Sequence, residues 1–155
     1  LPKDYMQGYE KFLVLKDRIN EFVQSKAALT LVNPSKIEIF EVMYVEVSIS
    51  LDIVIKDYNS YQSVYQTIYK KLVEFLDPIT GNFDRSGWKI GELPRKEIIY
   101  NYIKGVKDIK WIKSIYMFTK VVTLDGKKEI DFEEVKKQFF TVPIFGEPEI
   151  NVSID

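Results

Sequence analysis

Carboxylates are the side chains best suited to acid–base chemistry in this sequence, because the 155-residue chain contains no histidine and no cysteine. That absence removes the commonest general base, cysteine nucleophiles, thiolate metal sites and disulfides. Glu46 and Asp52 lie on the polar side of an alternating segment, and their spacing in a strand places them about 20 Å apart. Paired-carboxylate catalysis needs a much shorter separation. We therefore expect a protein that is not an enzyme, with no catalytic site and no metal site.

Three glycines between residues 77 and 94 raise the question of a phosphate-binding loop. Gly81, Gly87 and Gly91 fit neither the dinucleotide fingerprint nor a P-loop, and no Gly-Lys-Ser/Thr sequence follows them. Their expected role is to permit turns. Trp88 in the same loop fits two roles, an exposed interface anchor or an aromatic that holds the loop against the core, and we favour the core.

A row of tyrosines could in principle stack sugars or bases. Tyr58, Tyr61, Tyr65 and Tyr69 recur at three- and four-residue steps, which more often form the edge of a core or a subunit interface. The chain has 22 basic and 23 acidic residues, and this net charge of −1 argues against nonspecific binding to nucleic acid or an anionic membrane. We expect no cofactor, no small-molecule ligand, and neither a nucleic-acid nor a membrane partner.

Apolar periodicity predicts the elements of the first third of the chain. Residues 9–27 have the spacing of an amphipathic helix, and a short apolar run over 28–32 then meets the break at Asn33-Pro34. Residues 44–55 alternate between apolar and mostly polar side chains, which predicts a strand with one face in the core and the other toward water. The apolar residues of 37–43 fall on both parities, which fits either a bulge or a separate strand.

A second helix is predicted over 61–76, capped by Asp57 or Asn59, with a turn-rich loop over 77–94 after it. Pro94 suits the first turn of a third helix, and Gly105 can supply the left-handed residue that ends it.

The remaining third of the chain is predicted to consist of strands. Residues 109–122 are apolar on both parities, which predicts a central strand covered on both sides. Asp125-Gly126 indicates a tight hairpin turn, and extended segments are expected over 128–132, 139–145 and 150–154.

This order of elements predicts an α+β fold, in which a mostly antiparallel sheet is packed by two or three helices in one or more ferredoxin-like lobes. We expect an N-terminal helix and short strand over 1–34, an α+β core over 35–124 that includes the 77–94 loop, and C-terminal strands over 125–155, with a small second lobe as one alternative. The first residue, Leu1, indicates an excised or processed piece of a longer protein, and no signal peptide or membrane span is indicated.

The stretch from residue 76 to 106 resembles the C-terminal part of the baseplate J-like family, whose members are wedge proteins of contractile phage tails and related injection machines. The resemblance is carried by Leu76-Asp77-Pro78-Ile79-Thr80-Gly81, by Gly87-Trp88-Lys89-Ile90-Gly91, by a helix beginning at Pro94, and by Gly105-Val106 before a strand. The flanks agree in a helix over 16–27 before Pro34 and the long strand over 45–55, and in the ending over 140–152 with its sequence 142–146. The section 127–138 has no counterpart.

The resemblance implies a structural wedge subunit without chemistry. Several copies would surround a central hub, contact other wedge and hub proteins, and lie in a virion tail or an injection-system baseplate assembled in the bacterial cytoplasm. Loop-shaping or interface roles are then expected for Pro78, Gly81, Gly87, Trp88, Gly91, Pro94 and Gly105.

The alternative is a ligand- or nucleic-acid-binding α+β domain of another family, with the tyrosine row as its surface; a metal-independent hydrolase using Asp and Glu ranks lower. A wedge role also predicts exposed sheet edges or apolar patches, because the neighbours that cover them are absent from the isolated chain.

Overall fold

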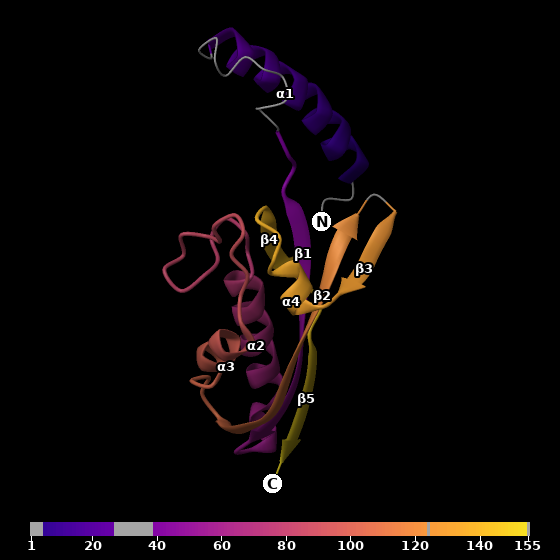
Figure 1. Cartoon of the computed structure of the whole chain (residues 1–155). Helices are drawn as coiled ribbons and strands as arrows, with labels where there is room; N and C mark the ends of the chain where they lie inside the picture. The colour runs from indigo at the N-terminus through magenta and orange to yellow at the C-terminus, as the bar shows by residue number, and fades with distance from the viewer. Residues whose placement is uncertain (1–4, 27–38, 124, 155) are drawn as a thin grey trace. The chain divides into compact units, whose positions relative to one another are not determined.

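The computed structural model describes residues 5–26, 39–123 and 125–154, and the chain divides into two compact units, Leu1–Glu41 and Val42–Asp155 (Figure 1). The first unit contains helix α1 (Tyr5–Lys26), which agrees with the predicted helix over 9–27 and begins earlier. The predicted short strand over 28–32, the break at Pro34 and residues 37–38 lie outside the described residues. Of the 37–43 segment, residues 39–42 form no regular strand and Met43 begins the first strand of the second unit. None of the described helices is long and apolar enough to cross a membrane.

The second unit contains a five-stranded sheet and its covering helices. In chain order it consists of β1 (Met43–Ile55), the short 3-10 helix η2 (Tyr58–Ser60), α2 (Tyr61–Phe75), α3 (Lys96–Ile103), β2 (Ile109–Thr123), β3 (Gly126–Ile130), α4 (Phe132–Val135), β4 (Thr141–Phe145) and β5 (Glu149–Ile154). The strand order is β3-β2-β1-β4, and β5 pairs with the rest of β1. The predicted α+β class is confirmed.

The sheet is mixed. β2 is antiparallel to both β1 and β3, whereas β4 and β5 are parallel to β1, and the antiparallel β1–β2 ladder is the longest. The succession from β1 to β4 is the β-α-β-β-α-β order of a ferredoxin-like lobe with a second helix, α3, between β1 and β2. In space, however, β1 and β2 are direct neighbours, with no other strand between them.

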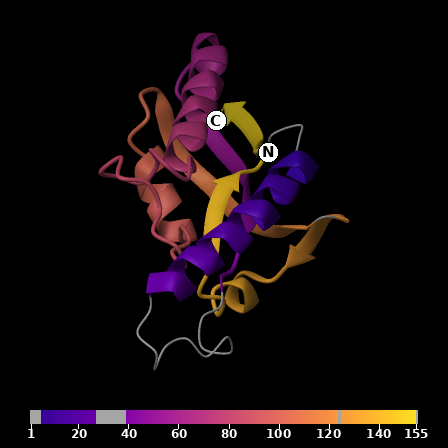
Figure 2. The same cartoon turned by 90° about the horizontal axis from the view of Figure 1, so that it is seen from above.

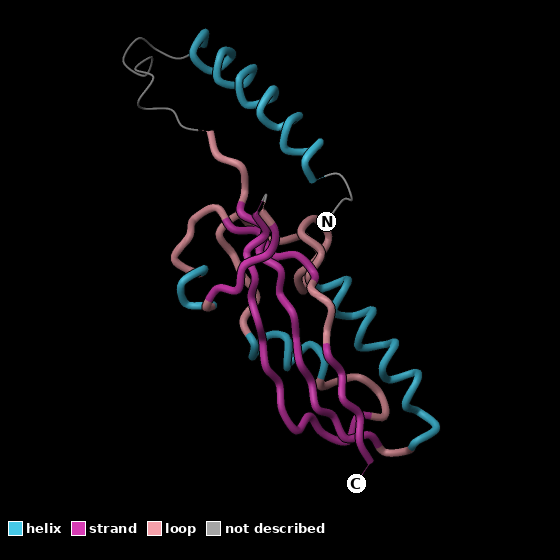
Figure 3. The backbone as a smooth tube through the Cα atoms, turned by 90° about the vertical axis from the view of Figure 1, so that its right-hand side faces the viewer, coloured by secondary structure: helices cyan, strands magenta, loops and turns pink. Residues whose placement is uncertain are grey.

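Two short strands share one edge of β1. β4 pairs with Met43–Val47, and β5 pairs with Ser50–Ile55, so β5 follows β1 to its end (Figure 3). Between them the Gly146 N–H donates to the Val47 carbonyl at 3.0 Å, which keeps the connecting turn against β1. The C-terminal strands therefore complete the same sheet and do not form a second lobe.

The core lies between one face of the sheet and helices α2 and α3, which cover the same side of β1 and β2 (Figure 2). Strand β1 contributes one alternating set of side chains, as its sequence predicts, and the helices contribute their apolar stripes. The central members of this cluster are Val45, Val47, Ile49, Leu51, Ile53, Ile55, Val64, Ile68, Leu72, Phe75, Ile99 and Ile103. Each such side chain contributes about 1.5–3 kcal/mol through burial.

Three local predictions need correction. Helix α3 begins at Lys96 with Arg95 as its N-cap, so Pro94 precedes the helix and is not in its first turn. Gly105 is not left-handed; the helix ends through Lys104 in right-handed geometry, and the positive φ of 68° falls on Asp108.

The third correction concerns β2, which was predicted to be covered on both faces. One of its faces is not covered by described residues, because Trp111, Tyr116 and Phe118 are exposed. Strand β1, paired along both edges, is the central strand. Asp57, one of the two predicted caps, accepts the Asn59 backbone N–H and caps η2 before α2.

Candidate functional site

The loop between α2 and α3 is rigidly built around Trp88. The Trp88 indole N–H donates to the Phe75 carbonyl at 2.9 Å, and its ring meets the Phe75 ring edge to face at 5.3 Å between centroids. Only 8% of Trp88 is exposed. Of the two roles considered for this residue, the structure has the one in which the aromatic holds the loop against the core.

Backbone hydrogen bonds close the same loop. The Gly87 N–H donates to the Gly81 carbonyl at 3.1 Å, and the Trp88 N–H donates to the Pro78 carbonyl at 3.1 Å. Gly87 and Gly91 have positive φ angles of 80° and 86°, which L side chains rarely adopt. These two glycines therefore permit turns, and the part of the loop that the structure describes contains no arrangement typical of a phosphate cradle.

Asp77 organises the start of the loop through its carboxylate. The hydrogen bond from the Thr80 backbone N–H, at 2.6 Å, is the main cause that holds the pKa of Asp77 below its ordinary value of 3.8, and the Ile79 N–H and Thr80 hydroxyl act in the same direction. Burial opposes this lowering. The ionised form is thus the one that the folded loop prefers.

This hydrogen bonding predicts a pH-dependent contribution to stability. Because the folded-state pKa of Asp77 lies below its unfolded value, the contribution is fully present above the unfolded pKa and is lost as the pH falls below 3.8. Urea unfolding of the wild type and of Asp77→Asn between pH 7 and pH 3 should show a difference that shrinks in acid. Asp125→Asn, in the exposed turn after β2, is the control, and a pH-independent difference for Asp77→Asn would contradict the prediction.

The predicted tyrosine row does not form one continuous surface. Tyr58 belongs to η2 and is 71% exposed, and its ring stacks on Tyr61 at 6.3 Å. Tyr69 packs edge to face on Phe145 of β4 at 5.4 Å, and its hydroxyl donates to Glu147 at 3.3 Å. The row is therefore split between an exposed end and an end that packs helix α2 against the C-terminal strands.

Exposed aromatic side chains gather on the side of the sheet opposite α2 and α3, which we call the open face. Cross-strand partners share a face, so the pairs Trp111 with Val54, Tyr116 with Ser50, and Phe118 with Ser48 place these aromatics opposite the core set of β1. Trp111, Tyr116 and Phe118 are 41%, 58% and 55% exposed.

The aromatics of the open face were not identified from the sequence. The sequence predicts instead that these side chains belong to a second buried face of the strand. Lys110, Lys113, Ser114 and Lys120 in the same strand are the sign that could have corrected this interpretation, because strands covered on both sides are almost continuously hydrophobic.

A polar cluster crosses the open face beside these aromatics. Asp52 of β1 accepts the Ser114 hydroxyl of β2, and it accepts the Asn151 side-chain amide of β5 at 3.1 Å. Those two hydrogen bonds, the Ser114 bond first, lower the pKa of Asp52. A general acid or base at neutral pH needs a pKa shifted toward 7, so this carboxylate is suited to joining three strands and not to proton transfer.

Among the described residues, no three carboxylates come close enough together to hold a metal ion. Glu46, the other carboxylate considered for chemistry, forms an ion pair with Lys127 of β3. The arrangement of the open face can therefore contact another surface, and its polar groups are already used in fastening strands together. No protein-family model and no curated protein matches this chain.

Proposed function

We propose that the chain is a structural wedge subunit of a contractile phage tail or of a phage-derived injection system, and that it acts through protein–protein interfaces. The observation that supports this most is the exposed aromatic surface on the open face of a sheet whose other face packs against helices. Aromatic side chains are enriched in the buried centres of interfaces, where a few of them supply most of the binding energy.

Further exposed apolar side chains support the same role. The loop presents Ile79, Phe83 and Ile90, and Phe139 between α4 and β4 is 88% exposed. Ile79, Phe83 and Ile90 lie on a loop whose backbone is closed by hydrogen bonds, so they would bind with little loss of conformational entropy. The loop therefore offers a further apolar surface for contact with a neighbouring subunit.

The proposal is tested by the genes that surround the one encoding this chain and by its deletion. Genes for a tail sheath, a tube and a spike beside it, together with sheathed particles that fail to assemble in the deletion strain, are the expected result. A host that makes no contractile particles, or makes complete ones without this gene, would overturn the proposal. Electron microscopy of purified particles distinguishes these outcomes.

The open face provides a sharper prediction. Replacing Tyr116 and Phe118 together by serine should reduce the number of complete particles on the order of tenfold or more, because each anchoring aromatic contributes about 2 kcal/mol or more to binding. The fold should persist, since both side chains are exposed. Circular dichroism checks the fold, and Tyr58→Ser, at an exposed position away from the sheet, is the control. Wild-type particle numbers in the double variant would exclude the open face as an interface.

A further inference from the structure

Strand β2 leaves part of its outer edge unpaired. Strand β3 pairs with β2 only from Thr119 to Thr123, and among the described residues no backbone hydrogen bond reaches the outer edge between Trp111 and Phe118. A strand paired on one side directs alternate N–H and C=O groups to the other side, where an extended peptide can add to the sheet. A strand added beside this part of β2 would therefore lie in line with β3.

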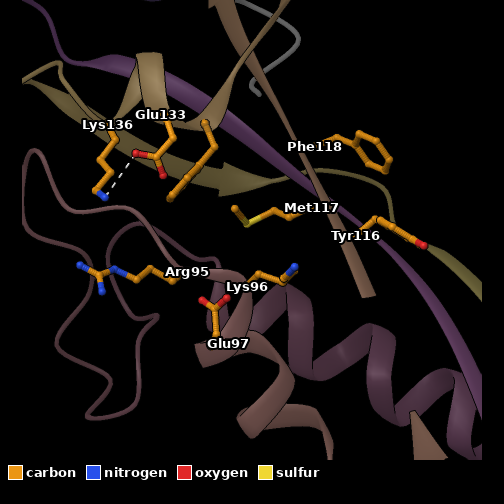
Figure 4. A pocket seen from close by; sticks show the side chains of 9 residues that line it. Arg95, Lys96, Glu97, Tyr116, Met117, Phe118, Glu133 and Lys136 are labelled. Carbon is orange, nitrogen blue, oxygen red and sulfur yellow. Dashed lines mark ion pairs between the residues drawn. The ribbon is translucent and has the colours of Figure 1, made fainter. Parts of the chain in front are cut away.

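A hollow of about 480 Å³ lies beside this edge, between the start of α3 and α4 (Figure 4). Met117 projects into it between Arg95, Lys96 and Glu97 on one side and the Glu133–Lys136 pair on the other. Tyr116 and Phe118 also line the hollow, but as the cross-strand partners of Ser50 and Ser48 they lie on the opposite face of β2 from Met117. A strand added along β2 would therefore direct one alternating set of its side chains toward the hollow and the other set toward the open face.

The charge of the hollow favours an acidic occupant. Lys136 is paired with Glu133 at 3.6 Å, whereas Arg95 and Lys96 are exposed and form no ion pair with another described residue. Glu97 offsets one of these two free cations, which leaves a positive excess at the N-terminal end of α3, where the helix dipole adds to it. Carboxylates entering the hollow would meet complementary charge.

We propose that the outer edge of β2 from Trp111 to Phe118, with the adjoining hollow, binds an extended acidic segment of a partner protein, which adds to the sheet as a strand. Its glutamate or aspartate side chains alternate with apolar ones: the carboxylates enter the hollow near Arg95 and Lys96, and the apolar side chains lie beside Tyr116 and Phe118. The partner's place in a baseplate rests on the proposed function, but the binding chemistry does not.

The experiment uses the full chain and a synthetic peptide of about eight residues in which glutamate alternates with valine or leucine, a length that spans the free edge. Isothermal titration calorimetry should show saturable one-to-one binding. The double variant Arg95→Gln and Lys96→Gln should weaken it by about tenfold, whereas Lys107→Gln, at an exposed lysine outside the hollow, should leave it unchanged. An alternating lysine–valine peptide should not bind.

Two N-methylated forms of the peptide test strand addition itself. Methylating one alternating set of N–H groups removes the donors that face β2 and should abolish binding, whereas methylating the other set should not. Equal binding of both forms, no binding of the acidic peptide, tighter binding of an oligonucleotide to the same two cations, or a dimer of the free chain formed through this edge would each overturn the proposal. Because the peptide is synthetic, such a result would leave the baseplate role to be judged by particle assembly alone.

Discussion

Replacing Trp88 with alanine is expected to lower the free energy of unfolding of the second unit by about 3–5 kcal/mol, the range for removing a buried large aromatic. The indole ring is 8% exposed, packs against Phe75, and satisfies the Phe75 carbonyl with its N–H. Its loss leaves a cavity beneath the loop, and the Phe75 carbonyl keeps only the hydrogen bond from the Asn82 N–H at 3.0 Å. Urea unfolding followed by tryptophan fluorescence measures the effect, because Trp111 remains as a reporter in the same unit.

Trp111 provides the matched control, since it is the other tryptophan of the chain and is 41% exposed. Trp111→Ala should change the unfolding free energy by only about 0.5 kcal/mol, as is usual for surface positions. Trp88→Phe should fall between the two, because it keeps the ring contact with Phe75 and loses the hydrogen bond. Similar losses for Trp88→Ala and Trp111→Ala would mean that Trp88 is not a core residue.

The second large effect is expected at Gly87. An alanine Cβ at this position would lie 2.5 Å from the Ile79 carbonyl oxygen and 2.7 Å from that of Pro78, and the φ angle of 80° is itself unfavourable for an L side chain. Backbone strain of this kind costs about 1–3 kcal/mol, and the clash adds to it. We expect Gly87→Ala to destabilise the second unit by about 2–4 kcal/mol.

Gly105 is the control for Gly87, because a Cβ there would meet nothing within 4 Å and its φ lies outside the left-handed region. Gly105→Ala should be neutral or stabilise the unit by about 0.4–1 kcal/mol, since it restricts only the unfolded chain. Thermal unfolding of the two variants side by side checks both expectations. A loss at Gly105 equal to that at Gly87 would restore the predicted helix-ending role of Gly105.

The tight turns show that the sequence alone does not determine which residue adopts a positive φ angle. Gly87 and Gly91 have the positive φ angles expected of turn glycines, but Gly105 does not, and Asp108 adopts the left-handed conformation instead. Glycine permits a positive φ without requiring it. Which residue adopts that angle depends on how the chain leaves α3 and enters β2, and this path is set by packing beyond the turn.

The alternation of β1 and the apolar stripe of α2 were determined by the sequence alone, because each follows from one element burying one face. Which strands occupy the edges of β1 and β2 was decided only by the tertiary structure. Strands β4 and β5 divide one edge of β1 between them, and β3 ends at Ile130, which leaves β2 open from Trp111 to Phe118. Strand pairing joins residues far apart in the chain, so the periodicity within one strand does not indicate which strands will be its neighbours. For the same reason the sequence predicts that the aromatics of β2 are buried, whereas in the structure they lie on the open face.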